Sequence, residues 1–183
     1  MISLVEIIRK NLGYNELHKI DPNTQDIRDD MKIHGSDSLA QAAVPAILCG
    51  LFNHLQNREA ALMILEGDSV NWLSTIFGDK KNELIDRIAI YGKSTPTAAK
   101  QEAEHIANEA VRIVRQNIPD PANLNMVQAF VTANKNDTLL YLPAVLGIGD
   151  LLNNNNLDDR TNKMEGPVSS FMHKLEKQFN KTE

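Results

Sequence analysis

The chain has little cysteine, few aromatic residues and no cluster of basic residues. Its single cysteine, Cys49, excludes an intrachain disulfide, and its place in the apolar run Val44–Phe52 indicates a small core side chain rather than a reactive thiol. Aromatic residues make up 5% of the chain, so aliphatic side chains and methionine must supply most of the core. With a net charge of −5 and no run of Lys or Arg, the sequence does not predict nucleic-acid binding.

Long hydrophobic runs are also missing. The longest ones, around Ala42–Phe52 and Leu139–Ile148, fall short of the roughly 18 apolar residues that a membrane span needs. The first residues are not expected to act as a signal peptide, because the basic residues follow the apolar ones and Glu6 interrupts them. The chain has 183 residues, of which 42% are hydrophobic and 23% charged, which is typical of a single globular domain. We therefore expect a cytoplasmic protein without a membrane span.

Hydrophobic periodicity predicts an all-α fold. Apolar residues recur at intervals of three and four, and alternation of period two never extends far enough for a strand. Ser, Thr, Asp and Asn precede many of these segments and Gly follows several, as at helix ends. The pattern predicts an irregular array of about eight to ten short helices. We expect helices over residues 4–12, 36–55, 57–65, 70–77, 80–91, 94–117, 123–132, 138–152 and 167–179, with Asp137 as the cap of the helix over 138–152. Residues 14–20 could form a further short helix, and residues 21–35 form either a loop or a loosely packed short helix.

Two prolines fall inside these expected helices. Pro45 either kinks its helix or begins a second helical segment, and Pro143 is expected to kink the helix over 138–152. Both prolines belong to similar seven-residue segments, Val44-Pro-Ala-Ile-Leu-Cys-Gly50 and Leu142-Pro-Ala-Val-Leu-Gly-Ile148. The similarity reflects either an internal duplication or two buried, kinked helices packed together, and we favour the second interpretation.

The chain is expected to divide into a helical core domain (1–152), a polar connector (153–166) and an amphipathic C-terminal helix (167–183). The C-terminal helix has a basic side and an apolar stripe, and the stripe comprises Val168, Phe171, Met172, Leu175 and Phe179. Such a helix can dock on its own core, pack against a partner subunit or lie on a membrane surface. We expect that it contributes to a homo-oligomer.

One candidate metal site lies in the expected helix over 94–117. Glu102, His105 and Glu109 share one face of that helix, and the spacing of Glu102 and His105 is the one used in carboxylate-bridged di-metal bundles. Such bundles need the motif twice, and the sequence contains it once. A solvated helix face with polar contacts between neighbouring turns is the alternative interpretation, which we favour.

A second candidate metal site lies in the polar connector. Asn154, Asn156, Asp158 and Glu165 supply oxygen atoms in an order similar to that of a calcium-binding loop. Asp159 stands where the sharp turn of such a loop requires glycine, so a helix-capping connector is the favoured interpretation. No phosphate-binding, dinucleotide-binding or nucleophile motif is present, and we expect no cofactor.

The region Gly67–Asn117 resembles the core of the YidB-like bacterial proteins of unknown function. The resemblance rests on the turn Ile76-Phe-Gly-Asp-Lys80, on the helix break Gly92-Lys-Ser-Thr-Pro96 and on the later apolar segment Leu142-Pro-Ala-Val-Leu146. The sequence lacks the glycine-rich stretches that are common in that family. The resemblance implies a bacterial protein, and it implies no activity and no catalytic residues.

Two hypotheses of function follow from these observations. The first is a non-enzymatic structural or protein-interaction module that self-associates, because a catalytic constellation is not evident and the C-terminal stripe needs a covering surface. The second is a small-molecule- or metal-binding helical protein, in which case the chain could be an enzyme. The sequence alone does not name a substrate or a partner.

Overall fold

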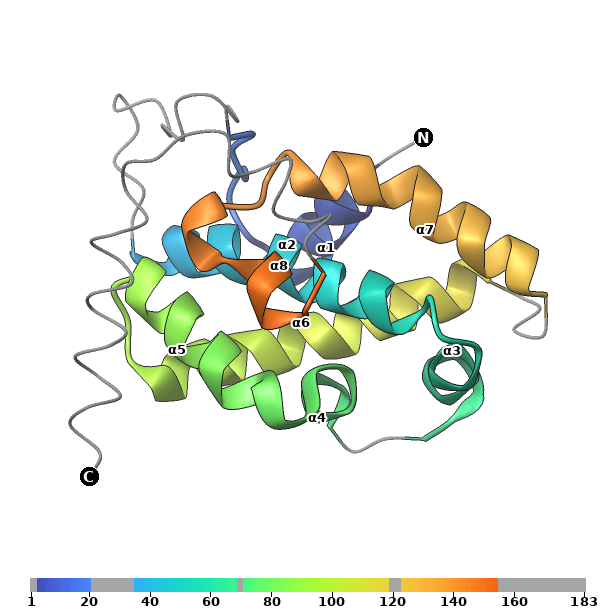
Figure 1. Cartoon of the computed structure of the whole chain (residues 1–183). Coiled ribbons are helices and arrows are strands. Elements are labelled where there is room, and N and C mark those ends of the chain that lie inside the picture. The colour runs from blue at the N-terminus through green and yellow to red at the C-terminus, as the bar shows by residue number, and fades with distance from the viewer. Residues whose placement is uncertain (1–2, 21–34, 69–70, 119–122, 155–183) are drawn as a thin grey trace.

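The computed structural model describes residues 3–20, 35–68, 71–118 and 123–154, and within these ranges it contains helices and no strands (Figure 1). The fold is therefore all-α, as the sequence predicts. Short 3-10 helices, labelled η, accompany the α-helices. The elements are α1 (Leu4–Leu12), α2 (Gly35–His54), α3 (Arg58–Glu66), α4 (Trp72–Phe77), η1 (Gly78–Lys80), α5 (Lys81–Tyr91), α6 (Pro96–Asn117), α7 (Leu124–Leu139), η2 (Ala144–Leu146) and α8 (Ile148–Leu151).

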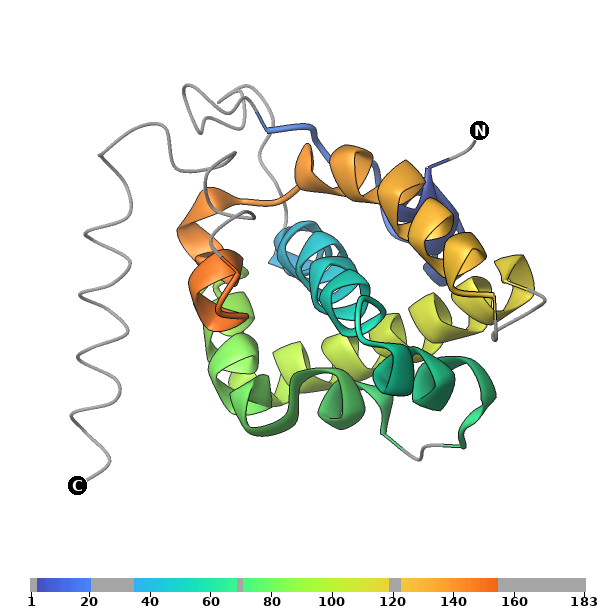
Figure 2. The same cartoon turned by 45° about the vertical axis from the view of Figure 1, so that its right-hand side comes forward.

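Helix α2 forms the centre of the fold. Every residue from Leu39 to Phe52 is buried, and α2 packs against α1, α4, α5, α6 and α7. Figure 2 shows α2 in the middle with the other helices around it. A helix that is apolar on nearly all sides is stable in water only when other elements cover it in this way. Within the described ranges, no single helix has the length and apolar composition of a membrane span, although 37–54 and 58–66, bent by 119°, reach it as a pair.

Helices α5 and α6 cover α2 with amphipathic faces, as the sequence predicts. On α5 the buried set includes Leu84 and Ile88, and on α6 alanines alternate with larger aliphatic residues along the buried face. Alanine lets neighbouring helices approach closely, and α6 contacts α2 and α5 along its length. The Thr95 side chain accepts a hydrogen bond from the Ala98 amide and caps α6, as the sequence pattern indicates.

The short helix that residues 14–20 could form is not present in the structure. This segment is not helical, because its main-chain groups bond to distant parts of the fold instead of to each other. The His18 amide and carbonyl both pair with the side chain of Gln41 on α2, and the Ile20 amide donates to the Leu140 carbonyl at 2.7 Å. These tertiary hydrogen bonds replace the helical ones.

The two prolines occupy different structures. Pro45 lies inside α2, which continues to His54, so it does not begin a separate helix. The prediction that Pro143 kinks a helix over 138–152 was wrong, because Pro143 has extended φ/ψ values of −64° and 122° and precedes η2. The expected helix is replaced by the end of α7, this extended turn, η2 and α8. The two similar segments are therefore not two packed, kinked helices.

Helix α7 is longer than predicted, and Asp137 does not cap a following helix. Asp137 lies in the last turn of α7, where its carboxylate accepts a hydrogen bond from Ser3 and lies 3.7 Å from the Lys19 amine. The expected helix over 70–77 begins later, at Trp72, with Asn71 as its cap. The expectations for residues 21–34 and for the connector and C-terminal helix beyond Asn154 lie outside the described residues.

Candidate functional site

A groove between the end of α2 and α7 is the candidate site. It encloses a cavity of about 350 Å³, which is at the small end of the range of ligand pockets. Leu55 and Val131 line it with side chains that are 2% and 6% exposed, so its apolar floor belongs to the core. Polar side chains complete the lining, namely Gln56, Gln128, Thr132, Lys135 and Asn136. The groove therefore has an apolar floor, a rim rich in hydrogen-bonding groups and one cation.

The last described residue, Asn154, is held close to the groove. Its side-chain amide donates to the Asn53 side-chain oxygen of α2 at 2.8 Å, and its main-chain amide donates to the Gly149 carbonyl at 2.8 Å. The Gln56 amide, in the turn after α2, donates to the Asn53 carbonyl at 3.3 Å, so these two residues are neighbours. Asn154 thus leads the chain out of the described fold near the rim formed by Gln56.

The three residues of the α6 candidate metal site do not converge in the structure. Glu109 accepts hydrogen bonds from Arg112 at 2.6 and 2.8 Å and from Asn11 of α1 at 2.7 Å, and these contacts hold the pKa of Glu109 below its usual value. Glu102 is hydrogen-bonded to the Tyr14 hydroxyl, and His105 is exposed. Burial, together with this Glu102 contact, raises the Tyr14 pKa.

Among the described residues, no group of three His, Cys, Asp or Glu side chains is arranged to hold a metal ion. Of the calcium-like loop, only Asn154 is described, and its amide is engaged as above. The other members of that loop and the apolar stripe lie outside the described residues: Asn156, Asp158, Glu165, Val168, Phe171, Met172, Leu175 and Phe179. Cys49 is buried in the core, as the sequence indicates.

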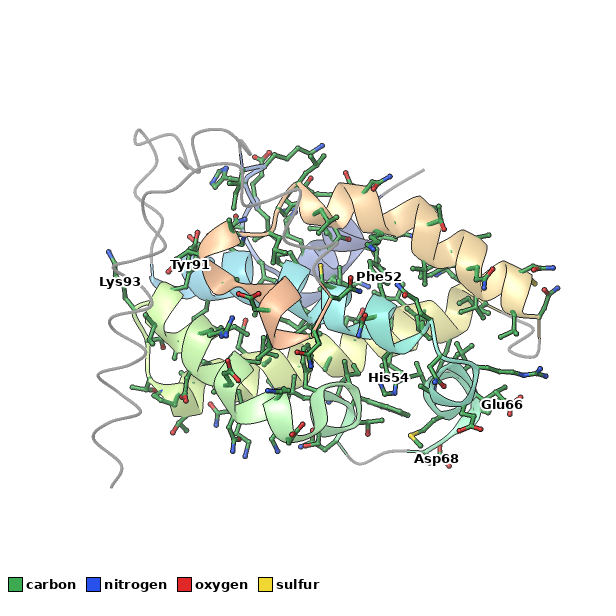
Figure 3. All side chains as sticks on the ribbon, in the orientation of Figure 1. Phe52, His54, Glu66, Asp68, Tyr91 and Lys93 are labelled. Carbon is green, nitrogen blue, oxygen red and sulfur yellow. The ribbon has the colours of Figure 1, made fainter. Side chains whose placement is uncertain are left out.

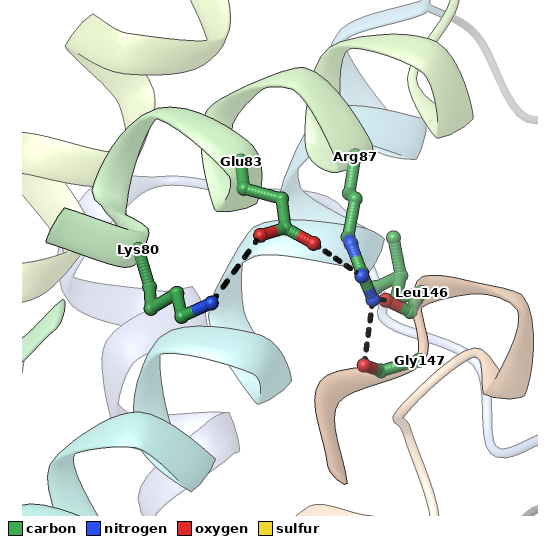
Figure 4. Close-up of polar contacts among 5 residues, drawn as sticks. All are labelled: Lys80, Glu83, Arg87, Leu146 and Gly147. Atoms are coloured by element: carbon green, nitrogen blue, oxygen red, sulfur yellow. Dashed lines mark hydrogen bonds and ion pairs between the residues drawn. The ribbon is translucent and has the colours of Figure 1, made fainter. Parts of the chain in front are cut away.

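Arg87 is a buried polar anchor that sequence analysis did not identify. Its side chain is 8% exposed, and Nη1 donates to the carbonyls of Leu146 and Gly147 at 2.7 and 2.6 Å (Figure 4). Nη2 forms an ion pair with Glu83 at 2.5 Å. At Gly147, φ is +53° and a Cβ would lie 2.7 Å from Nη1, so glycine is required for this contact. Arg87 therefore fixes η2 and α8 against α5.

Gln41 and Arg115 act in the same way elsewhere. The Gln41 side chain, 1% exposed, accepts from the His18 amide at 2.8 Å and donates to the carbonyls of His18 and Tyr141 at 3.0 and 2.9 Å. Arg115 of α6 donates to the carbonyls of Ile64 and Gly67 at the end of α3. Its guanidinium also lies 4.7 Å from the centre of the Trp72 ring, a cation–π distance.

His54 has its side chain in a partly desolvated environment. It ends α2 on the side of the fold where α3 lies (Figure 3), and its Nε2 atom is buried without a hydrogen-bond partner. Burial lowers its pKa from the usual 6.5. Tyr91, at the end of α5, is also desolvated, which raises its pKa to about 12. Both groups are therefore held in their neutral forms near neutral pH.

No family model, no curated protein and no solved structure matches the chain. The resemblance to the YidB-like proteins stays a prediction, and function has to be argued from the geometry described above.

Proposed function

We propose that this chain is a non-enzymatic structural or protein-interaction module that self-associates. The observation that supports this proposal most directly is the use of the buried side chains of Gln41 and Arg87 and of the half-buried side chain of Arg115. Each of them binds main-chain groups of another element, so its donors hold the fold together. A domain fixed in this way provides a rigid platform on which surface contacts can be made.

The apolar surface for self-association is assigned to the C-terminal stripe. Within the described residues, only two large apolar side chains are clearly exposed: Met63 at 55% and Leu140 at 42%. Isolated residues of this kind are ordinary on protein surfaces, whereas a continuous apolar patch indicates a contact surface. The five apolar residues between Val168 and Phe179 offer such a patch in the sequence.

Light scattering coupled to size-exclusion chromatography tests the proposal on the full chain. We expect a mass at least twice that of one chain, with dissociation on dilution. Replacing Phe171→Asp in the stripe should weaken the assembly at least about tenfold, because a charge would have to be buried. Lys177→Gln, on the opposite side of the expected helix, is the control and should leave the mass unchanged. A monomer at every concentration would contradict self-association.

Small-molecule binding is a second candidate, and the groove favours it. The Lys135 amine and the neighbouring amides and hydroxyl suit a small ligand that carries a carboxylate or another anionic group. A thermal-shift screen with small carboxylates and with calcium, manganese, iron and zinc tests both the groove and the sequence-based metal sites. A carboxylate-induced shift that Lys135→Met abolishes would support this candidate, and the absence of any shift would remove it.

A further inference from the structure

The groove between α2 and α7 has the form of a receptor for a side chain. Its floor is made by Leu55 and Val131, and its rim by amide and hydroxyl groups that can bond to main-chain atoms of a ligand. A cavity of about 350 Å³ holds one or two side chains rather than a whole helix. An occupant must therefore insert apolar anchors and lie across the rim, as in recognition of a helix by a groove.

The chain itself leads to this groove. Asn154 is bound to Asn53, and the sequence continues from there for a further 29 residues. The connector that ends at Gly166 can span up to about 40 Å when extended, at about 3.3 Å for each of its residues. Its length therefore allows the following segment to reach a groove on the same copy or on an adjacent one.

The C-terminal segment has the residues that such a groove accepts. Its stripe contains two aromatic residues, Phe171 and Phe179, together with Met172. Aromatic side chains and methionine are the usual anchors of protein contacts, because they bury large apolar areas.

We infer that the groove lined by Leu55 and Val131 receives residues 167–183. The inference rests on the self-association proposed above, and accordingly the segment that fills each groove in the assembly belongs to a second copy. Aromatic anchors of the stripe enter the cavity, and Gln56, Gln128 and Thr132 bond to polar groups of the inserted segment. Each copy then gives one segment and accepts one, which closes a symmetric dimer.

Disulfide trapping in the full chain tests this arrangement. Because Cys49 is buried, engineered thiols can be oxidised without interference from it. One protein carries Thr132→Cys on the groove rim, a second carries Met172→Cys in the stripe, and the two are mixed under mild oxidation. Gln101→Cys, exposed on α6, replaces the groove thiol in the control mixture. A disulfide forms efficiently only when the two Cα atoms lie within about 7 Å.

The outcomes test the groove as the receiving site and the self-association independently. A mixed disulfide between the two proteins, several-fold more abundant than in the control, supports both. If only the double variant Thr132→Cys/Met172→Cys forms a disulfide, within one chain, the groove receives the segment but the exchange between copies is wrong. Dimers without either disulfide overturn the groove as the receiving site and leave self-association intact. Circular dichroism of each variant confirms that the fold is retained.

A rim substitution provides an independent measurement. Thr132→Arg places a large charged side chain over the cavity and should raise the dissociation constant of the assembly several-fold, whereas Gln101→Arg should not change it. An unchanged dissociation constant for Thr132→Arg would overturn the inference.

Discussion

The segments Val44–Gly50 and Leu142–Ile148 are similar in sequence and different in structure. Both place an apolar residue, proline and alanine before further apolar residues, and both are largely buried. The first is part of the central helix α2, whereas the second is an extended turn followed by η2 and the start of α8. The comparison shows that the sequence of a buried Pro-Ala segment does not by itself determine its backbone conformation.

Partners from elsewhere in the chain account for the difference. The first segment is buried within α2, which packs against five other helices, so packing stabilises the helix despite the proline. In the second segment, Leu142–Ile148, the carbonyls of Leu146 and Gly147 accept hydrogen bonds from the Arg87 guanidinium. A buried cation thus stabilises the turn by binding carbonyl groups of two successive residues.

Arg87→Leu should have the largest effect on this comparison. It leaves two carbonyl groups and the Glu83 carboxylate without their cation, so we expect a loss of about 3 kcal/mol in the free energy of unfolding. Urea denaturation provides the measurement. Arg112→Leu is the matched control, because Arg112 also pairs with a glutamate on its own helix but is exposed, and it should change stability little. Equal losses for both variants would contradict the role given to Arg87.

Gly50→Ala tests the packing of the first segment, Val44–Gly50. A Cβ at position 50 would lie 2.1 Å from Cζ of the Phe77 ring, which is buried. Alanine normally favours a helix over glycine, but here overpacking should dominate and cost about 2 kcal/mol. The double variant Gly50→Ala/Phe77→Leu removes the clash, so adding alanine to Phe77→Leu should be neutral or stabilising. If Gly50→Ala alone stabilises the chain, α2 and α4 do not pack as closely as described.

The smallest effect is expected from His54, at the end of the same central helix. Its folded-state pKa is lowered by burial, so the unfolded chain binds a proton more readily than the folded one. Stability should therefore decrease as pH falls through about 6.5 and stop changing below the folded-state pKa. His54→Gln should flatten this part of the curve. Urea denaturation between about pH 8 and about pH 5 measures it, above the range where carboxylates with lowered pKa values contribute. The same slope in both proteins would contradict this assignment.

The sequence predicts those elements whose stability is local. Helices α5 and α6 have a continuous apolar face and, for α6, a threonine cap, so their positions follow from spacing alone. The segment 14–20 and the region after α7 could not be predicted, because Gln41 and Arg87 hold them from far away in the sequence. A signal was present in both cases. Gln41 is a polar residue within an apolar run, and Arg87 lies one turn from Leu84 on the apolar face of α5.

No comparable feature of the sequence predicts the groove. Leu55 in the turn after α2 and Val131 in α7 are ordinary apolar residues that are distant in the sequence, and only their packing creates a cavity. Conversely, Glu102, His105 and Glu109 form a regular pattern on one helix, but Tyr14, Asn11 and Arg112 engage the two carboxylates. Spacing along a helix therefore indicates which side chains share a face, and it does not indicate which neighbours will bind them.

The Gln41 side chain also has a consequence for the order of folding. Its amide joins two segments that lie 23 and 100 residues away in the chain, and it is satisfied only after both have reached α2. An intermediate that packs α2 with only one of them would bury an unpaired amide group, at a cost of about 1–3 kcal/mol. Partly assembled states are penalised as a result, and the arrival of both ends becomes a single cooperative step. Gln41 thus helps to couple the two ends of the described domain into one folding unit.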